Sequence, residues 1–263
     1  MLYTNSNTGI KTFYNEKLSV NIFATREEMG KYAGKEVVSK IRELLEGKNE
    51  INMIFAAAPS QEELIEYLIK NPTVQWNRIN AFHMDEYIGL GSENPQSFGN
   101  HLRKRLFSKV PIKSVNYING EAKDTEAECE RYAQLLRLHP ADIVCLGIGE
   151  NGHLAFNDPH VADFNDPCLV KAVDLELVCR QQQVNDGCFS RLHMVPDKAI
   201  TLTIPALMRA PWIFCLAPAS SKAQAVYRTL NNGINEKCPA TILRTKENAK
   251  LYLDEKSASL LEV

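Results

Sequence analysis

The sequence predicts a single α/β domain over residues 1–263, built as a Rossmann-like, doubly wound and mostly parallel sheet. Three observations support this fold class. Strand-like and helix-like patterns alternate along most of the chain, which is typical of a parallel sheet covered on both faces. Several strand candidates are short apolar runs, as in strands that are buried on both faces. The length of 263 residues is sufficient for one full core and does not require a second domain.

The strands are predicted from apolar or alternating runs between turn signals. The chain starts with polar residues, so the first strand is expected at Leu18. The predicted strands are 18–23, 51–56, a run ending at Asp85, 115–118, 144–146, 199–204, 212–216 and 249–253.

The helices are predicted from capping residues followed by apolar positions at helical spacing. Thr25 with Glu28, and Ser60 with Glu63, match the capping box, so Ser60 is interpreted as a helix cap. The predicted helices run from Thr25 to near Gly47, from Ser60 through Ile69, from Pro95 through Phe107, from Thr125 to Leu138 and through Ala225–Leu230. The segment between Asp158 and Arg191 is irregular, and we interpret it as a functional loop or lid.

Composition narrows the classes of partner. A net charge of −2, with 44% hydrophobic and 24% charged residues, is ordinary for a soluble globular protein. We therefore expect no nucleic acid and no membrane as a partner, and any site for an anionic metabolite must be local. No apolar run approaches the roughly 20 residues of a membrane span, and residues 1–13 do not resemble a signal peptide. These observations predict a cytoplasmic protein.

The seven cysteines include no Cys-x-x-Cys pair and no zinc-like cluster with histidine. Cys145 and Cys215 stand in apolar runs, where a cysteine behaves as a small buried hydrophobe. We expect reduced structural thiols, no metal site and no cofactor.

The stretch after the strand at 144–146 gathers the residue types of an active site. The candidate site residues in it are three glycines and three of its polar side chains: Gly147, Gly149, Gly152, Asn151, His153 and Asp158. Glycine permits a close approach of the backbone to a ligand. Ligands bind beyond the carboxyl ends of the strands in open α/β sheets, so this stretch is predicted to form the site.

Three further strand ends carry polar groups. Asp85 and Glu86 stand at the end of one strand, before the turn at Gly89. Ser60 and Lys222 stand where strands give way to helices, and the N–H groups and dipole of a helix N-terminus favour an anion. Together these groups predict proton transfer next to a carbonyl or imine on an anionic small molecule.

Two motifs resemble the glucosamine-6-phosphate deaminase family, also called glucosamine-6-phosphate isomerase. Met84-Asp85-Glu86-Tyr87 precedes Gly89-Leu90, and Gly147 to Pro159 follows the family's Gly-x-Gly-x-(Asp or Asn)-Gly-His pattern. The resemblance extends from Asn52 to about Leu253. It implies the fold shared by the deaminase, phosphogluconolactonase and ribose-phosphate isomerase families. The implied substrate is a small-molecule sugar phosphate, with glucosamine 6-phosphate converted to fructose 6-phosphate and ammonia.

The resemblance also implies roles for individual residues. Asp85 matches the proton-transferring aspartate, His153 the histidine of ring opening, and Lys222 a lysine that contacts the substrate phosphate. Asn151 and Asp158 would orient His153 or tune its pKa. The residues expected to bind substrate are Ala57, Ser60, Gln61, Glu86, Gly149, Gly152 and Lys222.

The chain departs from the family pattern at the phosphate. Residues 56–61 read Ala-Ala-Ala-Pro-Ser-Gln where the family has Thr-Gly-Gly-Thr-Pro, and Gly187 replaces a phosphate-binding arginine. Arg180 and Arg191 are the candidate replacements. Asn151 and Asp158 stand where the best-known members have aspartate and glutamate. We therefore predict a divergent deaminase or isomerase, with the accepted anion or sugar left open.

Two alternatives stay open. A 6-phosphogluconolactonase-like hydrolase shares the fold and a Gly-His element, although Ala155-Phe156-Asn157 fits the deaminase pattern better. The other alternative is a non-catalytic sugar-phosphate sensor. Such sensors can be joined to a DNA-binding module, and this sequence shows no helix-turn-helix segment. The oligomeric state is open as well, and a homo-oligomer is possible.

Overall fold

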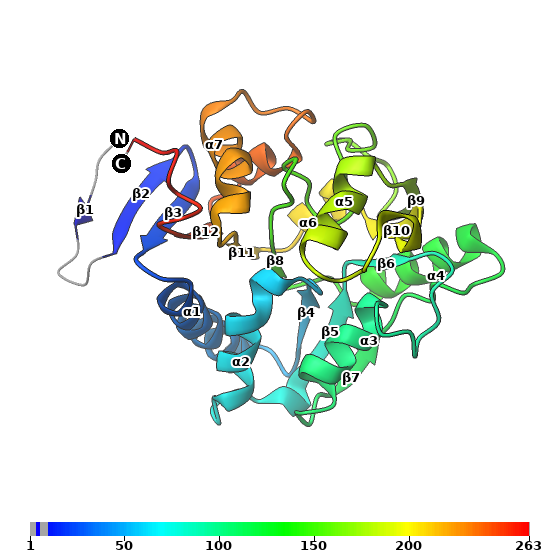
Figure 1. The fold of residues 1–263 in the computed structure, drawn as a ribbon. Coiled ribbons are helices and arrows are strands. Elements are labelled where there is room, and N and C mark those ends of the chain that lie inside the picture. The colour runs from blue at the N-terminus through cyan, green and yellow to red at the C-terminus, as the bar shows by residue number, and fades with distance from the viewer. Residues whose placement is uncertain (1–3, 6–9, 263) are drawn as a thin grey trace.

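A nine-stranded sheet forms the centre of the computed structural model, which describes residues 4–5 and 10–262 (Figure 1). Its strand order is β1-β2-β3-β12-β11-β8-β4-β5-β7. All pairs from β3 to β7 are parallel, whereas β1 and β2 pair antiparallel at one edge. The predicted mostly parallel sheet is confirmed. The strands are β1 (Thr4–Asn5), β2 (Lys11–Asn15), β3 (Leu18–Phe23), β4 (Ile51–Phe55), β5 (Ile79–His83), β7 (Ser114–Asn116), β8 (Ile143–Leu146), β11 (Trp212–Leu216) and β12 (Ala249–Asp254).

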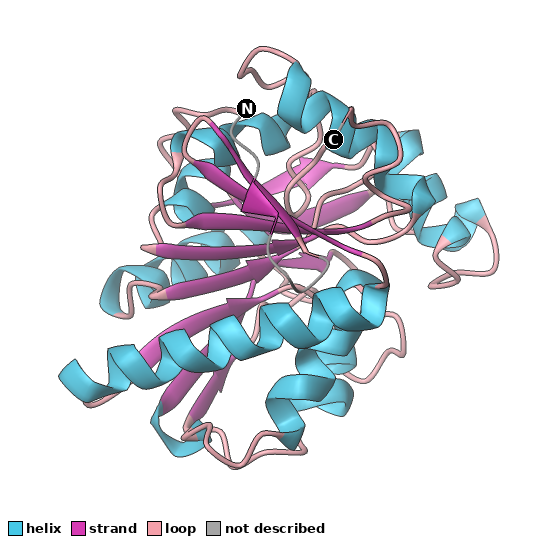
Figure 2. Ribbon diagram, turned by 90° about the vertical axis from the view of Figure 1, so that its left-hand side faces the viewer, coloured by secondary structure: helices cyan, strands magenta, loops and turns pink. Residues whose placement is uncertain are grey.

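Helices cover both faces of this sheet (Figure 2). One core lies between the sheet and the first three helices, and a second core lies between the opposite face and α4, α6 and α7. The doubly wound arrangement predicted from the alternating pattern is therefore confirmed. The helices are α1 (Arg26–Gly47), α2 (Glu62–Lys70), α3 (Phe98–Leu102), α4 (Thr125–Leu138), α5 (Leu177–Asn185), α6 (Ile204–Met208) and α7 (Ala223–Asn231).

The direction of winding reverses between β4 and β8. The chain proceeds from β4 to β5 and β7 on one side, and then returns to β8, β11 and β12 on the other. The connections after β4 and β8 leave the sheet in opposite directions, which opens a crevice at the carboxyl ends of these two strands. The fold thus offers a ligand site at this point.

A second, three-stranded sheet stands beyond the carboxyl end of β5. It consists of β6 (Asp85–Tyr87), β10 (Lys198–Leu202) and β9 (Val170–Asp174), paired antiparallel. The prediction that one strand continues to Asp85 is wrong. The hydroxyl of Tyr132 binds both the N–H and the carbonyl oxygen of His83, so β5 ends there and Asp85 starts a new strand.

The two predicted caps have different outcomes. The Thr25 hydroxyl accepts from the Glu28 N–H at 3.1 Å, which confirms the first. Ser60 does not cap α2, because it lies inside a 3₁₀ turn over Pro59–Gln61 and the α-helix begins at Glu62. The Ser60 hydroxyl instead accepts from Gln61 Nε2 at 3.0 Å.

The segment interpreted as irregular contains β9 and α5. Helix α5 escaped prediction because Gln182 and Gln183 form most of its buried face beside Cys179, so its apolar pattern is weak. Strand β2 was not predicted because Phe13 is its only buried residue, so its apolar pattern is weak. Within the described ranges, we find no helix with the length and hydropathy that crossing a membrane requires.

Candidate active site

A pocket opens at the switch point of the sheet. Part of its wall is formed by residues that follow four strands: β4 (Ala56–Ser60), β5 (Met84 and Asp85), β8 (Gly147–Gly149) and β11 (Pro218, Ala219, Ser221 and Lys222). Gln182, Gln183 and Asp186, which belong to or follow α5, also line the pocket. The remaining lining residues are Arg26, Phe98, His153, Ala155 and Phe156. The pocket therefore brings together residues from four separate strand ends, as the position of the switch point requires.

Asp85 carries a buried carboxyl group in this pocket. The residue is 7% exposed, and no group in the described part of the chain donates a hydrogen bond to its side chain. Burial, together with the negative charge of Glu86, raises the pKa of Asp85 well above the usual value. A carboxylate with few partners and a raised pKa is a stronger base than an ordinary aspartate.

His153 is held by Asp158 and Asn151. Its Nδ1 lies 3.0 Å from Asp158 Oδ1, and its backbone N–H donates to Asn151 Oδ1 at 3.0 Å. Asn151 Nδ2 donates to the same Asp158 oxygen at 2.8 Å. Burial raises the pKa of Asp158, but the hydrogen bonds and charge of His153, with help from Asn151, outweigh it and leave that pKa lowered. His153 lines the pocket, whereas Asn151 and Asp158 do not.

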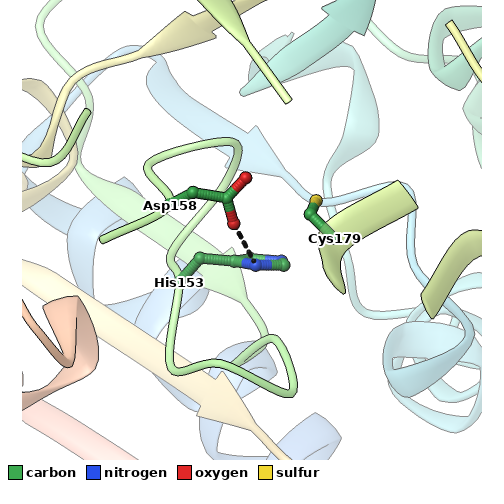
Figure 3. A group of neighbouring side chains, drawn as sticks. All are labelled: His153, Asp158 and Cys179. Atoms are coloured by element: carbon green, nitrogen blue, oxygen red, sulfur yellow. Dashed lines mark ion pairs between the residues drawn. The ribbon is translucent and has the colours of Figure 1, made fainter. Parts of the chain in front are cut away.

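Cys179 completes this group from α5 (Figure 3). A nitrogen of His153, an oxygen of Asp158 and the sulfur of Cys179 lie within 4.8 Å of one another, so the three could offer ligands to a metal ion. Burial and the charge of Asp158 raise the pKa of Cys179, so the sulfur is a neutral thiol as long as no metal ion is bound.

The three glycines of the central stretch make room for protein groups. A β-carbon on Gly149 would stand 2.1 Å from Cε1 of the His153 ring, and one on Gly147 would stand 2.7 Å from the Ser60 hydroxyl. Gly152 has a φ of +92°, a conformation that L side chains rarely adopt. Gly149 thus lines the pocket and leaves room for the His153 ring, while Gly152 allows the turn between Gly149 and His153.

Lys222 brings a cation into the pocket. The residue is 8% exposed, and the described part of the chain gives its ammonium group no ion pair within 4.0 Å. Burial lowers the pKa of Lys222, although the charges of Asp186 and Glu150 partly oppose this. The turn before it is fixed by Ala219, which has a φ of +79° and donates its N–H to Asp254 at 3.0 Å. A buried cation without a partner is suited to an anionic ligand.

The other predicted binding residues divide into two groups. Ala57 and Ser60 line the pocket. Gln61 and Glu86 do not, because protein groups occupy them. Gln61 Nε2 donates to the Leu146 carbonyl at 3.0 Å. The Glu86 carboxylate accepts from the N–H groups of Tyr87, Phe98 and Gly99 and from the Ser97 hydroxyl, which ties the start of α3 to β6.

Neither arginine considered as a replacement at the phosphate reaches the pocket. Arg180 donates to the carbonyls of Leu192 and Val195, and Arg191 is exposed. The arginine that does line the pocket is Arg26, from the first turn of α1. Sequence reasoning missed it, because nothing in its neighbourhood distinguishes it from a solvated helix residue.

The fold and the pocket define an α/β protein with a buried acid, a histidine–carboxylate pair and a cation at the switch point of its sheet. A model of the family described as glucosamine-6-phosphate isomerases/6-phosphogluconolactonase matches residues 24–253. The chain belongs to this family of enzymes, which confirms the family predicted from the two motifs.

Curated relatives agree with this assignment. A glucosamine-6-phosphate deaminase of Listeria monocytogenes serotype 4a (strain HCC23) is 35% identical over 231 residues, which cover 88% of this chain and 97% of the relative. A protein of the same name from Bacillus cereus (strain B4264) is 32% identical over 243 residues, which cover 92% of this chain and 89% of the relative.

Solved structures share the fold. A monomeric glucosamine-6-phosphate deaminase superposes with a TM-score of 0.84 at 32% identity, covering 92% of this chain and 99% of that one. A 6-phosphogluconolactonase from Thermotoga maritima gives a TM-score of 0.73 at 23% identity, covering 89% of this chain and 98% of that one. The second likeness concerns the fold alone.

Proposed function

We propose that this enzyme converts glucosamine 6-phosphate and water to fructose 6-phosphate and ammonia, with Asp85 as the proton-transferring base and His153 as the ring-opening residue. The observation that carries the proposal is the convergence of three groups in one pocket: the Asp85 carboxylate, the His153 imidazole and the Lys222 ammonium. The names of the relatives at 32–35% identity support the same reaction.

Ring opening is assigned to His153. Since Nδ1 is buried and lies 3.0 Å from Asp158 Oδ1, Nε2 is the nitrogen left to exchange a proton with the sugar. The imidazole transfers a proton from the C1 hydroxyl to the ring oxygen, which yields the open-chain aldehyde. Asp158 stabilises the protonated imidazole during this exchange, and Asn151 fixes Asp158.

Isomerisation is assigned to Asp85. Its carboxylate removes the proton from C2 of the open-chain sugar while the aldehyde oxygen at C1 gains a proton, which gives an enolamine. The carboxylate then returns its proton to C1 and the nitrogen loses one, so that an imine replaces the amine at C2. Water then adds to the imine and ammonia leaves, giving the ketone. The raised pKa of Asp85 favours proton removal from a weakly acidic carbon. Lys222 holds the phosphate, and the reaction would take place in the cytoplasm.

Ammonia release tests the proposal. Purified protein is offered glucosamine 6-phosphate, glucosamine and N-acetylglucosamine 6-phosphate, with Asp85→Asn as the inactive control. We expect turnover of glucosamine 6-phosphate and its loss in the variant. If the folded protein releases no ammonia but opens 6-phosphogluconolactone, the lactonase alternative is correct, and if it binds sugar phosphates without any turnover, the sensor alternative is correct.

A further inference from the structure

We infer that Arg26, at the start of α1, binds the phosphate of the substrate together with Lys222, and so replaces the arginine that Gly187 has displaced. The inference rests on the proposed function for the identity of the ligand. It concerns the anion-binding half of the pocket, to which Arg26 contributes a guanidinium group and Lys222 an amino group.

Close packing of two helices brings Arg26 to the pocket. Gly30 and Gly34 lie one turn apart on α1, and β-carbons there would stand 2.2 Å from Glu63 Cβ and 2.5 Å from Tyr67 Cδ1. Only glycines allow α1 to approach α2 this closely. The first turn of α1 therefore lies against the residues that lead into α2, which are the residues aligned with the family's phosphate loop.

Contacts fix the guanidinium at that loop. Arg26 Nε donates to Glu63 Oε1 at 2.5 Å, and Nη2 donates to the carbonyl oxygen of Pro59. A guanidinium has five N–H donors, and these two contacts engage two of them. Donors on Nη1 and Nη2 are left for a ligand in the pocket that Arg26 lines. A planar fork with free donors matches the geometry of a phosphate.

Helix stability does not explain an arginine at this position. A cation in the first turn of a helix opposes the helix dipole, which favours acids there, and Glu27 and Glu28 follow that preference. The ion pair with Glu63 is also partly exposed, with 29% of the Arg26 side chain accessible, and such pairs stabilise a fold only slightly. A role toward a ligand accounts for the residue better.

The sequence of the loop after β4 also favours a side-chain cation at the phosphate. The loop carries alanines and a proline where the family pattern has two glycines, so its backbone cannot wrap an anion as closely as a glycine-rich loop does. Pro59 also lacks an N–H donor. A side-chain cation that reaches over this loop compensates for the missing backbone donors.

Calorimetric binding of glucosamine 6-phosphate and of inorganic phosphate tests the inference. The titrations use an Asp85→Asn background, so that the sugar is not consumed. We expect Arg26→Gln to weaken both ligands by about 10- to 100-fold, which is the range for a charge-assisted hydrogen bond to phosphate. Arg26→Lys should recover part of the loss, because lysine keeps the charge but not the fork.

Two further variants separate ligand binding from a structural role. Arg105→Gln is the matched control, since Arg105 Nη2 pairs with Glu62 Oε1 at 2.9 Å, one residue from Glu63 but outside the pocket. It should bind both ligands as the parent does. Glu63→Gln keeps Arg26 but removes its ion pair, and we expect phosphate binding at least as tight as in the parent.

Two results would overturn the inference. One is unchanged phosphate affinity in a folded Arg26→Gln protein. The other is a loss in Glu63→Gln equal to that in Arg26→Gln, which would mean that Arg26 acts only by holding α2. Failure of the proposed function is a separate result: an enzyme with Asp85 intact that binds phosphate through Arg26 but releases no ammonia would refute the deaminase reaction and support the inference.

Discussion

Replacing Gly149 with alanine should disable His153 while leaving anion binding intact. The new β-carbon would stand 2.1 Å from Cε1 and 2.2 Å from Nε2 of the imidazole. An ordinary contact begins at 3.4 Å, so the ring must move by about 1.3 Å. Such a movement breaks the 3.0 Å contact between His153 Nδ1 and Asp158 Oδ1. Misplacing a catalytic group by about 1 Å costs on the order of 100-fold in rate.

Steady-state kinetics with glucosamine 6-phosphate measure this effect. We expect kcat to fall by about 100-fold, equivalent to about 2.7 kcal/mol of transition-state stabilisation, with the affinity for inorganic phosphate unchanged. Gly233→Ala is the control, because its β-carbon would meet nothing closer than Asn235 Nδ2 at 3.8 Å. A Gly149→Ala enzyme with kcat close to that of the parent would refute the assigned position and role of His153.

Three other substitutions give distinct readouts. Asp158→Asn should lower kcat by about 10²–10⁴-fold, because the buried partner of His153 loses its charge. The pH dependence of kcat should differ from that of the parent enzyme for the same reason. Asp85→Asn should raise the melting temperature at neutral pH. Because the pKa of Asp85 is raised in the folded state, the folded state binds this proton more tightly than the unfolded state does. This contribution to the free energy of unfolding is lost as the pH rises from the ordinary carboxyl pKa through the raised one. An equal or lower melting temperature at pH 7 would contradict this. Ala219→Gly should stabilise the fold by about 1 kcal/mol in chemical denaturation, because φ of +79° and ψ of 153° strain an alanine but not a glycine, and a clear loss of stability would speak against that strain.

The parallel sheet was predictable because its strands carry their signal locally. Trp212–Leu216 and Leu18–Phe23 have the bounds that their apolar or alternating pattern indicates. Predictions failed where packing overrides the local pattern. Tyr132 ends β5 at His83 through contacts that span 49 positions in the sequence, and α5 buries glutamines beside the pocket.

The site was predictable to the extent that its residues belong to the two motifs. Asp85 and His153 meet in one pocket because the carboxyl ends of β5 and β8 lie at the same edge of the sheet. Glu86 shares a motif with Asp85, but adjacent side chains of a strand point to opposite sides. Glu86 therefore points away from the pocket and accepts hydrogen bonds from the start of α3. Arg26 could not be found from sequence, since only the α1–α2 contact brings it near the loop after β4.

The most direct test of the account is the reaction of glucosamine 6-phosphate in D₂O, followed by NMR of the products. If Asp85 transfers the proton from C2 to C1 and exchanges with solvent, the enzyme should form ammonia and fructose 6-phosphate in equal amounts, with deuterium at C1. The Asp85→Asn enzyme should form neither product. Equal turnover and deuteration by that variant would contradict the role of Asp85, and the absence of any product from the folded parent enzyme would contradict the reaction itself.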